Sequence, residues 1–424
     1  MRRFDVSRAA RTACAALCVP FMFQAAWAQG LSLDAALATS LAHHPDLRAS
    51  VLEREASEGA TQQAGAWQNP ELSTLVEDTR QATRTTTIQL NQPIELGGKR
   101  SARISAARAS QGQAELDVAA RRAQVRSQVM AAFYGVAVAQ ERVRLADELG
   151  RLSSQAREAA SKRVLAGKVS PVEELKAQVA EAQALSASTV AHSEWRAAVA
   201  QLRQALGDPT VKFERVDADI GRLPSAGLWE PLAQRLETAP AIARAQQEIS
   251  RRQALSDLER ARRTPDLTVT LGAKRDQQLG RDQPILGVSL VLPLFDRNQG
   301  AILEASRRED KARIELEAVR ASVEAQATQA LAQLSATLAQ AQTLRDKVLP
   351  AARQAFAAST KGYELGKFGF LDVLDAQRTL FEAETQALSA AAQGVSGFLC
   401  VRRGNESTTS LSLGPCQAAG GAPG

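Results

Sequence analysis

Two very long stretches almost free of helix breakers constrain the fold more than any other feature of the sequence. They run from Lys99 to Val164 and from Asn298 to Tyr363. Both are rich in Ala, Gln, Glu, Arg and Leu, which are good helix formers. At 1.5 Å per residue, each would span roughly 100 Å as a helix. A compact globular domain has no room for two such helices, so we expect long helical hairpins.

The second stretch also has the spacing of a coiled-coil seam. Leu331, Leu334, Leu338 and Ala341 recur at steps of three and four residues, which favours packing along a narrow stripe. Pro350 should kink or loosen this helix, because proline cannot donate a backbone hydrogen bond.

The chain reads as two copies of one plan. Three pairs of anchors occur in the same order: NPELS at 69–73 with TPDLT at 264–268, Pro93 with Pro293, and Gly167-Lys168 with Gly366-Lys367. Each copy starts with a helical segment, Asp34–Ala66 or Leu228–Arg263. Two strands, the long helix, a glycine-marked turn and a return helix follow, the last at Pro171–Leu206 or Phe370–Phe398. Order and spacing together indicate duplication.

These features predict four segments. They are a signal peptide at 1–28; a first repeat at 29–227 with a β-hairpin at 71–92 and a turn at 165–171; a second repeat at 228–399 with a β-hairpin at 266–293 and a turn at 364–371; and a C-terminal tail at 400–424.

The N-terminus has the pattern of a secretory signal. A basic start is followed by an apolar run and by Ala26-Trp27-Ala28, a small-x-small cleavage site. The bulky Leu17 before Cys18 argues against a lipid anchor. Without this leader, the 52 basic and 46 acidic residues fall to 48 and 45. That balance is not typical of a nucleic-acid-binding protein.

No mature segment reaches the roughly 18 to 20 apolar residues of a transmembrane helix, so entry into a membrane would require a β-barrel. The strands alternate apolar and polar residues, as lipid-facing strands do, although a soluble sheet gives the same pattern. The outward apolar set is Ile88, Leu90, Leu267, Val269, Leu271, Leu286, Val288 and Leu290. Four strands cannot close a barrel, whereas three copies would supply twelve.

The stretch QPIELGGKR at 92–100 marks a change of direction. Its Gly-Gly-Lys lacks the GxxxxGK spacing of a phosphate loop. Pro93 is instead expected to end a strand, Gly97 and Gly98 to form a turn, and Lys99 to begin the long helix.

A resemblance to a known family rests on these residues. Gly362-Tyr363-Glu364-Leu365-Gly366-Lys367, continuing to Asp372-Val373-Leu374-Asp375-Ala376-Gln377, resembles the second periplasmic turn of TolC-type outer-membrane factors. The PIELGGKR stretch is similar to their heavy-metal branch, which serves cobalt–zinc–cadmium or copper–silver exporters. Phe368 differs from the Arg that many drug-efflux members carry there.

The resemblance implies a mainly α fold with a small β part. A trimer would form a transmembrane β-barrel with four strands per chain and a long coiled-coil α-barrel in the periplasm. It further implies a passive, non-enzymatic duct in the outer membrane for heavy-metal cations, with no cofactor. Its partners would be a periplasmic adaptor and an inner-membrane proton-driven pump. The adaptor-contacting turns would include Gly167, Lys168, Gly366, Lys367 and Phe368.

Two carboxylates are candidates for a gate at the second turn. Asp372 and Asp375 are three residues apart, so a helix places them on one face. Under threefold symmetry they would form a cation-attracting ring of six carboxylates. The alternative is a pair of ordinary solvated carboxylates. The first copy has Glu173 and Lys176 there, so a ring depends on the second copy.

Other candidate sites are weaker. Cys400 and Cys416 either form a local disulfide or stay free thiols in the tail. No Cys, His and carboxylate pattern has metal-site spacing, and we expect no bound metal. No nucleic-acid, catalytic-triad, dinucleotide or metalloprotease motif occurs.

Three other functions remain open at this point. An outer-membrane factor for organic solutes or drugs would have the same architecture. A periplasmic adaptor would have one hairpin flanked by β-domains, whereas this chain repeats two. A coiled-coil envelope protein would not need alternating strands.

Overall fold

The computed structural model describes residues 30–78, 80–218 and 239–406, with side chains through residue 394. The elements run in the order α1 (Leu33–His43), α2 (Pro45–Gly65), β1 (Glu71–Glu77), β2 (Thr85–Ile94), α3 (Lys99–Leu165), α4 (Pro171–Leu206), α6 (Pro240–Arg262), β3 (Leu267–Asp276), β4 (Arg281–Leu290), α7 (Gln299–Thr343), the π-helical turn η1 (Leu344–Val348), α8 (Leu349–Glu364) and α9 (Phe370–Glu406).

The described chain divides into two compact units, and each contains parts of both repeats. The first unit comprises residues 30–44, 126–218 and 334–399, and the second comprises 45–78, 80–125, 239–333 and 400–406. Helices α3 and α7 each continue from one unit into the other. The boundaries of the compact units therefore do not coincide with the boundaries of the two sequence repeats.

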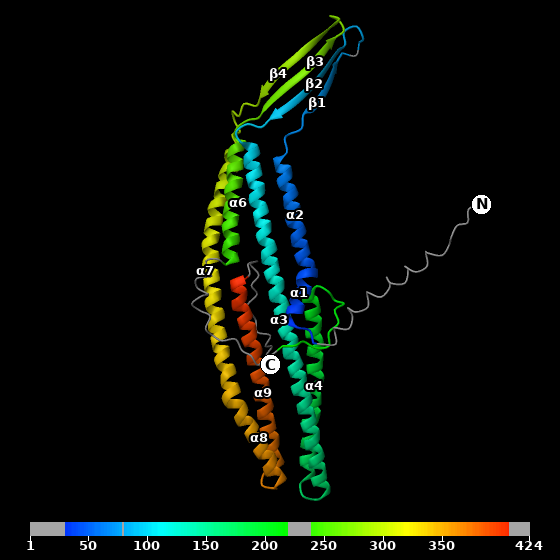
Figure 1. Cartoon of the computed structure of the whole chain (residues 1–424), viewed down its shortest axis with the longest axis vertical. Coiled ribbons are helices and arrows are strands. Elements are labelled where there is room, and N and C mark those ends of the chain that lie inside the picture. The colour runs from blue at the N-terminus through cyan, green and yellow to red at the C-terminus, as the bar shows by residue number, and fades with distance from the viewer. Residues whose placement is uncertain (1–29, 79, 219–238, 407–424) are drawn as a thin grey trace, which may run out of the picture. The chain divides into compact units, whose positions relative to one another are not determined.

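The second unit contains one antiparallel sheet in the order β1-β2-β3-β4 (Figure 1). The two predicted strand pairs are joined because β2 pairs with β3. In this register Leu90 faces Leu271, which in turn faces Leu286. All eight apolar residues predicted to face outward consequently share one face of the sheet.

The predicted ends of both hairpins were wrong: the first was predicted to end at residues 92–93 and continues to Ile94, and the second was predicted to end at residue 293 and ends at Leu290. Strand β2 continues to Ile94, and Pro93 pairs with Thr268 inside it. Proline is tolerated there because β1 pairs with β2 only as far as Asn91. Beyond that residue, β2 has a strand on one side only, so no ladder bond is lost on the other side.

The first long helix matches the prediction closely, and the second is interrupted where proline predicted it. Helix α3 is continuous from Lys99 to Leu165. In the second repeat, η1 separates α7 from α8, and Pro350 lies in the first turn of α8. The wider π-helical turn accommodates the backbone carbonyl that the proline ring would otherwise contact.

Two other helix predictions need correction. The segment predicted as one helix over Asp34–Ala66 is split into α1 and α2 at His44, because the residue before Pro45 disfavours helical backbone and His44 is extended. Helix α9 continues past the predicted Phe398 to Glu406. The leader, residues 228–238 and Cys416 lie outside the described residues, as does the side chain of Cys400.

Candidate functional site

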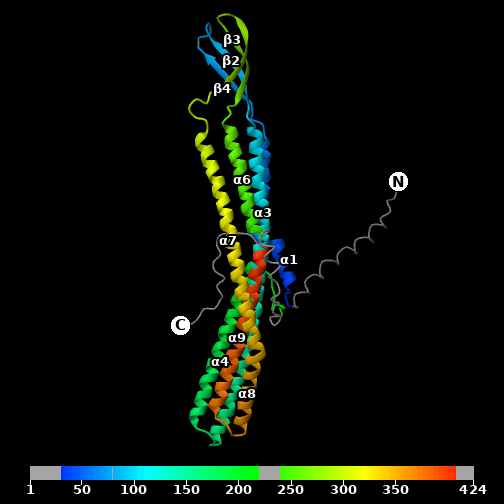
Figure 2. The same ribbon diagram turned by 90° about the vertical axis from the view of Figure 1, so that its left-hand side faces the viewer.

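The turns α3–α4 and α8–α9 form the candidate site, and both belong to the first unit (Figure 2). A hydrophobic cluster joins their helices. It consists of Ala160, Ala177, Tyr363, Phe370 and Val373. Because these side chains are buried together, the two turns pack as neighbours.

Both turns have the same backbone. Gly167 and Gly366 adopt left-handed φ values of 69° and 72°. The bonds correspond one to one: Gly167 N to Val164 O (2.9 Å) and Lys168 N to Arg163 O (2.9 Å), against Gly366 N to Tyr363 O (3.0 Å) and Lys367 N to Gly362 O (2.8 Å). This pattern is a glycine-terminated helix end, which satisfies carbonyls that would otherwise lack a partner.

The side chains of the second turn pack more tightly than those of the first. Tyr363 is buried, and its ring centroid lies 5.7 Å from that of Phe370. Its counterpart in the first turn, Val164, is only half-buried. The neighbouring Leu165 is 85% exposed. Tyr363 and Phe370 therefore form a buried aromatic pair, the aromatic lock of the second turn, and the first turn has no equivalent.

One arginine connects the two turns. The Arg163 guanidinium lies 4.2 Å from the centre of the Tyr363 ring and donates a hydrogen bond to the Tyr363 carbonyl oxygen at 3.3 Å. This cation–π contact is of a kind worth about 0.5–2 kcal/mol. Sequence reasoning missed it, because no spacing rule relates residues 200 positions apart.

A second connection involves the Gln of the DVLDAQ motif. Gln377 is buried and donates from Nε2 to the Ser153 hydroxyl on α3 at 3.2 Å. Such a buried bond costs stability if either partner is removed. The motif therefore has a packing role in addition to the role of its carboxylates.

The turn residues predicted to contact an adaptor are accessible. Gly167, Lys168, Gly366, Lys367 and Phe368 are all exposed. The Phe368 ring is half exposed, and it lies against Gly362, where any side chain would overlap it. The position of Phe368 thus depends on that glycine.

The two gate candidates lie in the first turns of α9, and both are exposed. Asp372 accepts a hydrogen bond from the Gly369 backbone N–H at 2.9 Å, so it caps its own helix. Asp375 lies two positions before the buried Gln377. Of the pair, Asp372 has a local structural role besides any role in a gate.

The first turn is flanked by a charged pair on α3. Lys162 Nζ lies 2.8 Å from Glu158 Oε1. The hydrogen bond from Lys162 lowers the pKa of Glu158 below its usual range. Because both side chains are solvent-exposed, this pair contributes charge at the surface and little stability.

The apolar strand residues are also accessible. Exposed fractions reach 78% at Leu286 and 66% at Val288, whereas Leu267 and Val269 are half-buried. On the other face, Thr87 is buried and Thr270 Oγ1 donates to Asn91 Oδ1 at 2.7 Å. The sheet thus has one apolar and one polar face.

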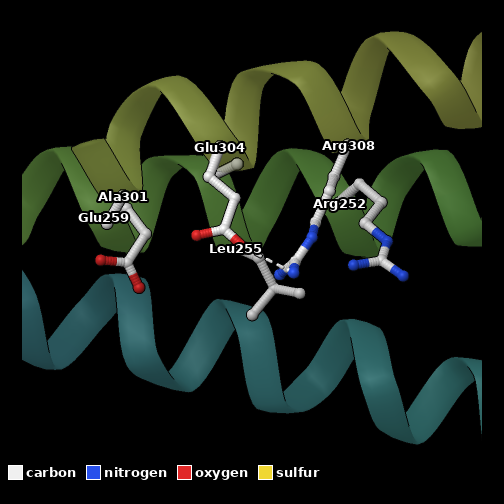
Figure 3. A pocket seen from close by; sticks show the side chains of 7 residues that line it. Arg252, Leu255, Glu259, Ala301, Glu304 and Arg308 are labelled. Carbon is white, nitrogen blue, oxygen red and sulfur yellow. Dashed lines mark ion pairs between the residues drawn. The ribbon is translucent and has the colours of Figure 1, made fainter. Parts of the chain in front are cut away.

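A small cavity of about 130 Å³ lies between α6 and α7 in the second unit (Figure 3). Its charged residues pair within the chain: Arg308 with Glu304 at 2.5 Å, Arg252 with Glu248 at 2.6 Å and Glu259 with Arg262 at 2.6 Å. Each of these pairs joins side chains three or four positions apart on one helix, so the charged residues that line the cavity already have a partner on their own helix.

Among residues 30–78, 80–218 and 239–406, no group of three or more His, Cys, Asp or Glu could hold a metal ion. Within the same ranges, no helix is long and apolar enough to cross a membrane.

Comparison with known proteins gives a family match and several relatives. The model of the family described as outer membrane efflux protein matches residues 36–208 and 232–396. The cobalt-zinc-cadmium resistance protein CzcC of Cupriavidus metallidurans is 45% identical over 86% of this chain and 87% of its own length. The nickel-cobalt-cadmium resistance protein NccC of Alcaligenes xylosoxydans xylosoxydans is 29% identical over 67% of this chain and 66% of its own length.

Solved structures show the same fold. CusC, described as forming a transmembrane channel, superposes with a TM-score of 0.75 at 18% identity, over 89% of this chain and 92% of that one. The outer membrane protein VceC of Vibrio cholerae gives a TM-score of 0.74 at 17% identity, over 88% and 96% of the two chains.

Proposed function

The chain belongs to the outer membrane efflux protein family, and on this premise we propose that it is the outer-membrane exit duct of a tripartite heavy-metal efflux system. The observation that supports this most is the 45% identity to a cobalt-zinc-cadmium resistance protein over most of both chains. Divalent cobalt, zinc and cadmium are therefore the proposed cargo.

In this function the chain acts as a passive, non-enzymatic conduit. Three copies would join their sheets in the outer membrane, with the apolar face that includes Leu286 and Val288 toward lipid and the threonine-rich face toward water. The helices would extend into the periplasm after cleavage of residues 1–28. A proton-driven inner-membrane pump would supply the energy.

The paired turns would be the gate and the contact with a periplasmic adaptor. The exposed Lys168 and Lys367, with Phe368, offer the adaptor a mixed charged and aromatic surface. Asp372 and Asp375 from three copies would line the opening with six carboxylates. Such a ring concentrates cations and repels anions without binding a metal so tightly that it cannot leave.

A deletion strain tests the cargo. Cells without this protein should accumulate cobalt, zinc or cadmium and lose tolerance to at least one of them, and a plasmid copy should restore both. Metal content per cell is the readout, because it separates export from general envelope damage. Unchanged metal content together with increased sensitivity to organic compounds would refute the metal cargo and favour a duct for organic solutes.

A further inference from the structure

We propose that the junction between β4 and α7 binds residues 69–71 of a second copy of this chain. The inference rests on the proposed oligomeric duct and identifies one surface that joins its copies. It starts from the matching junction of the first repeat, between β2 and α3, which the chain covers by itself.

That intramolecular joint is formed by residues 264–266. Asp266 Oδ1 accepts from Lys99 Nζ at 2.8 Å and from the Leu96 backbone N–H at 3.4 Å. Thr264 occupies the space into which a side chain at Gly97 would point. The Lys99 side chain is left only 13% exposed. An acidic residue after a proline thus closes the start of α3.

The second junction has the same length and the same helix entry. Pro93 precedes α3 by six positions, as Pro293 precedes α7. The residue before each helix is left-handed: φ is 73° at Gly98 and 59° at Asn298. The Asn298 side chain holds this conformation by donating to the Glu259 backbone carbonyl and carboxylate at 2.8 Å each.

Nothing among the described residues covers this second junction as residues 264–266 cover the first. Asp296, Arg297 and Gln299 are all exposed. The duplicated counterpart of the covering segment is Asn69-Pro70-Glu71, and those three residues are exposed too. The second junction therefore has no covering segment, and residues 69–71 are a covering segment without a junction to cover. These are the two halves of the proposed joint.

The sheet prevents the two halves from meeting within one chain. Glu71 begins β1 at one edge, whereas residues 291–298 follow β4 at the other, with β2 and β3 between them. Edge strands have unpaired backbone groups that can join another chain. A head-to-tail contact between copies brings one edge to the other, and such contacts form a closed ring when the rotation between copies closes.

One charge at each half is complementary, Arg297 at the junction and Glu71 at the covering segment, whereas the neighbouring Asp296 accepts from the Asn298 backbone N–H within the chain. The second junction replaces Lys99 by Gln299 and Gly97 by Arg297, so its cation lies two positions earlier. Arg297 donates from Nε to the Pro293 carbonyl at 3.3 Å. The guanidinium has further N–H groups that can bind a carboxylate. Glu71 of the second copy is that carboxylate, in the role that Asp266 has within the chain.

Charge exchange tests the contact in the full-length protein, extracted in mild detergent from outer membranes. We expect Arg297→Glu and Glu71→Arg each to lower the temperature at which oligomers dissociate by about 5 °C. The double exchange should recover at least half of that loss. A double variant whose dissociation temperature falls by the sum of the two single decreases would overturn the proposal.

Cross-linking tests the direction of the contact in a Cys400→Ser/Cys416→Ser background. Glu71→Cys mixed with Arg297→Cys should give a disulfide-linked dimer, and the double cysteine variant should give larger covalent oligomers. Cross-links in either single variant alone, or none in the mixture while oligomers persist, would refute the proposed joint. Lipid covering the exposed Leu294 and Phe295 would produce the latter result. Absence of any oligomer would instead contradict the proposed duct.

Discussion

The two helical turns of the first unit have one backbone and two different sets of side chains. Gly167 and Gly366 end their helices with the same left-handed geometry and the same hydrogen bonds. Around the first turn lie Val164 and the exposed Leu165, whereas Tyr363 and Phe370 form a buried aromatic pair at the second. The glycine thus sets the path of the chain, and the side-chain packing around it differs between the two copies.

This difference predicts its largest effect at the aromatic lock. Tyr363→Ala should destabilise the second turn by about 3–5 kcal/mol, because it leaves a cavity among buried side chains. The matched change Val164→Ala should cost about 1 kcal/mol, since Val164 is half-buried. Hydrogen exchange of the amides at each turn measures both. Equal destabilisation of the two turns would contradict the proposed difference in their side-chain packing.

A smaller effect is expected at Gly362. In Gly362→Ala the new methyl group would overlap the Phe368 ring, and such overpacking typically costs about 1–3 kcal/mol. Gly135→Ala is the control, because nothing lies within 4 Å of the added carbon. This helix-interior change should stabilise α3 by about 0.5–1 kcal/mol. Denaturation midpoints would show the opposite signs, and the same sign in both would contradict the contact.

The connection between the turns comes next in size. Arg163→Gln should weaken protection of the second turn by about 0.5–2 kcal/mol through loss of the cation–π contact. Lys162→Gln removes an equal charge from the exposed side of the same helix and should leave the second turn unchanged. Amide exchange at residues 361–368 is the readout. A response to both substitutions would indicate a general charge effect instead.

The smallest structural effect is expected at the carboxylates of α9. Asp372→Ala/Asp375→Ala should leave assembly intact but reduce cation selectivity, measured as the reversal potential across planar bilayers under one salt gradient. Glu173→Ala/Glu174→Ala removes as many charges from the first copy. We expect that control to keep the wild-type value. Identical reversal potentials in all three proteins would show that these carboxylates are ordinary, salt-screened surface charges.

Local features of the fold could be predicted because they depend on neighbouring residues. The bounds of α3 and α4, the two glycine turns and the interruption near Pro350 follow from helix propensity and backbone geometry. Strand alternation predicts Leu90, Leu271 and Leu286 to face outward, and the register of the strands brings them together on one face. The errors at Pro93 and His44 were also local, and both involve how a neighbouring proline is accommodated.

The sequence by itself determined the repeats, the helix ends and the faces of the strands, since glycine, proline and side-chain periodicity act over a few residues. Only the tertiary structure decided which distant side chains meet. Arg163 contacts Tyr363, and Gln377 bonds to Ser153 at a separation of 224 residues. The tertiary structure also divided the chain into units that cut across both repeats. The physical reason is that long helices pack along their whole length. Which residues meet therefore depends on the face that each helix turns to its neighbour and on their positions along the helix axes, and no local sequence pattern specifies either.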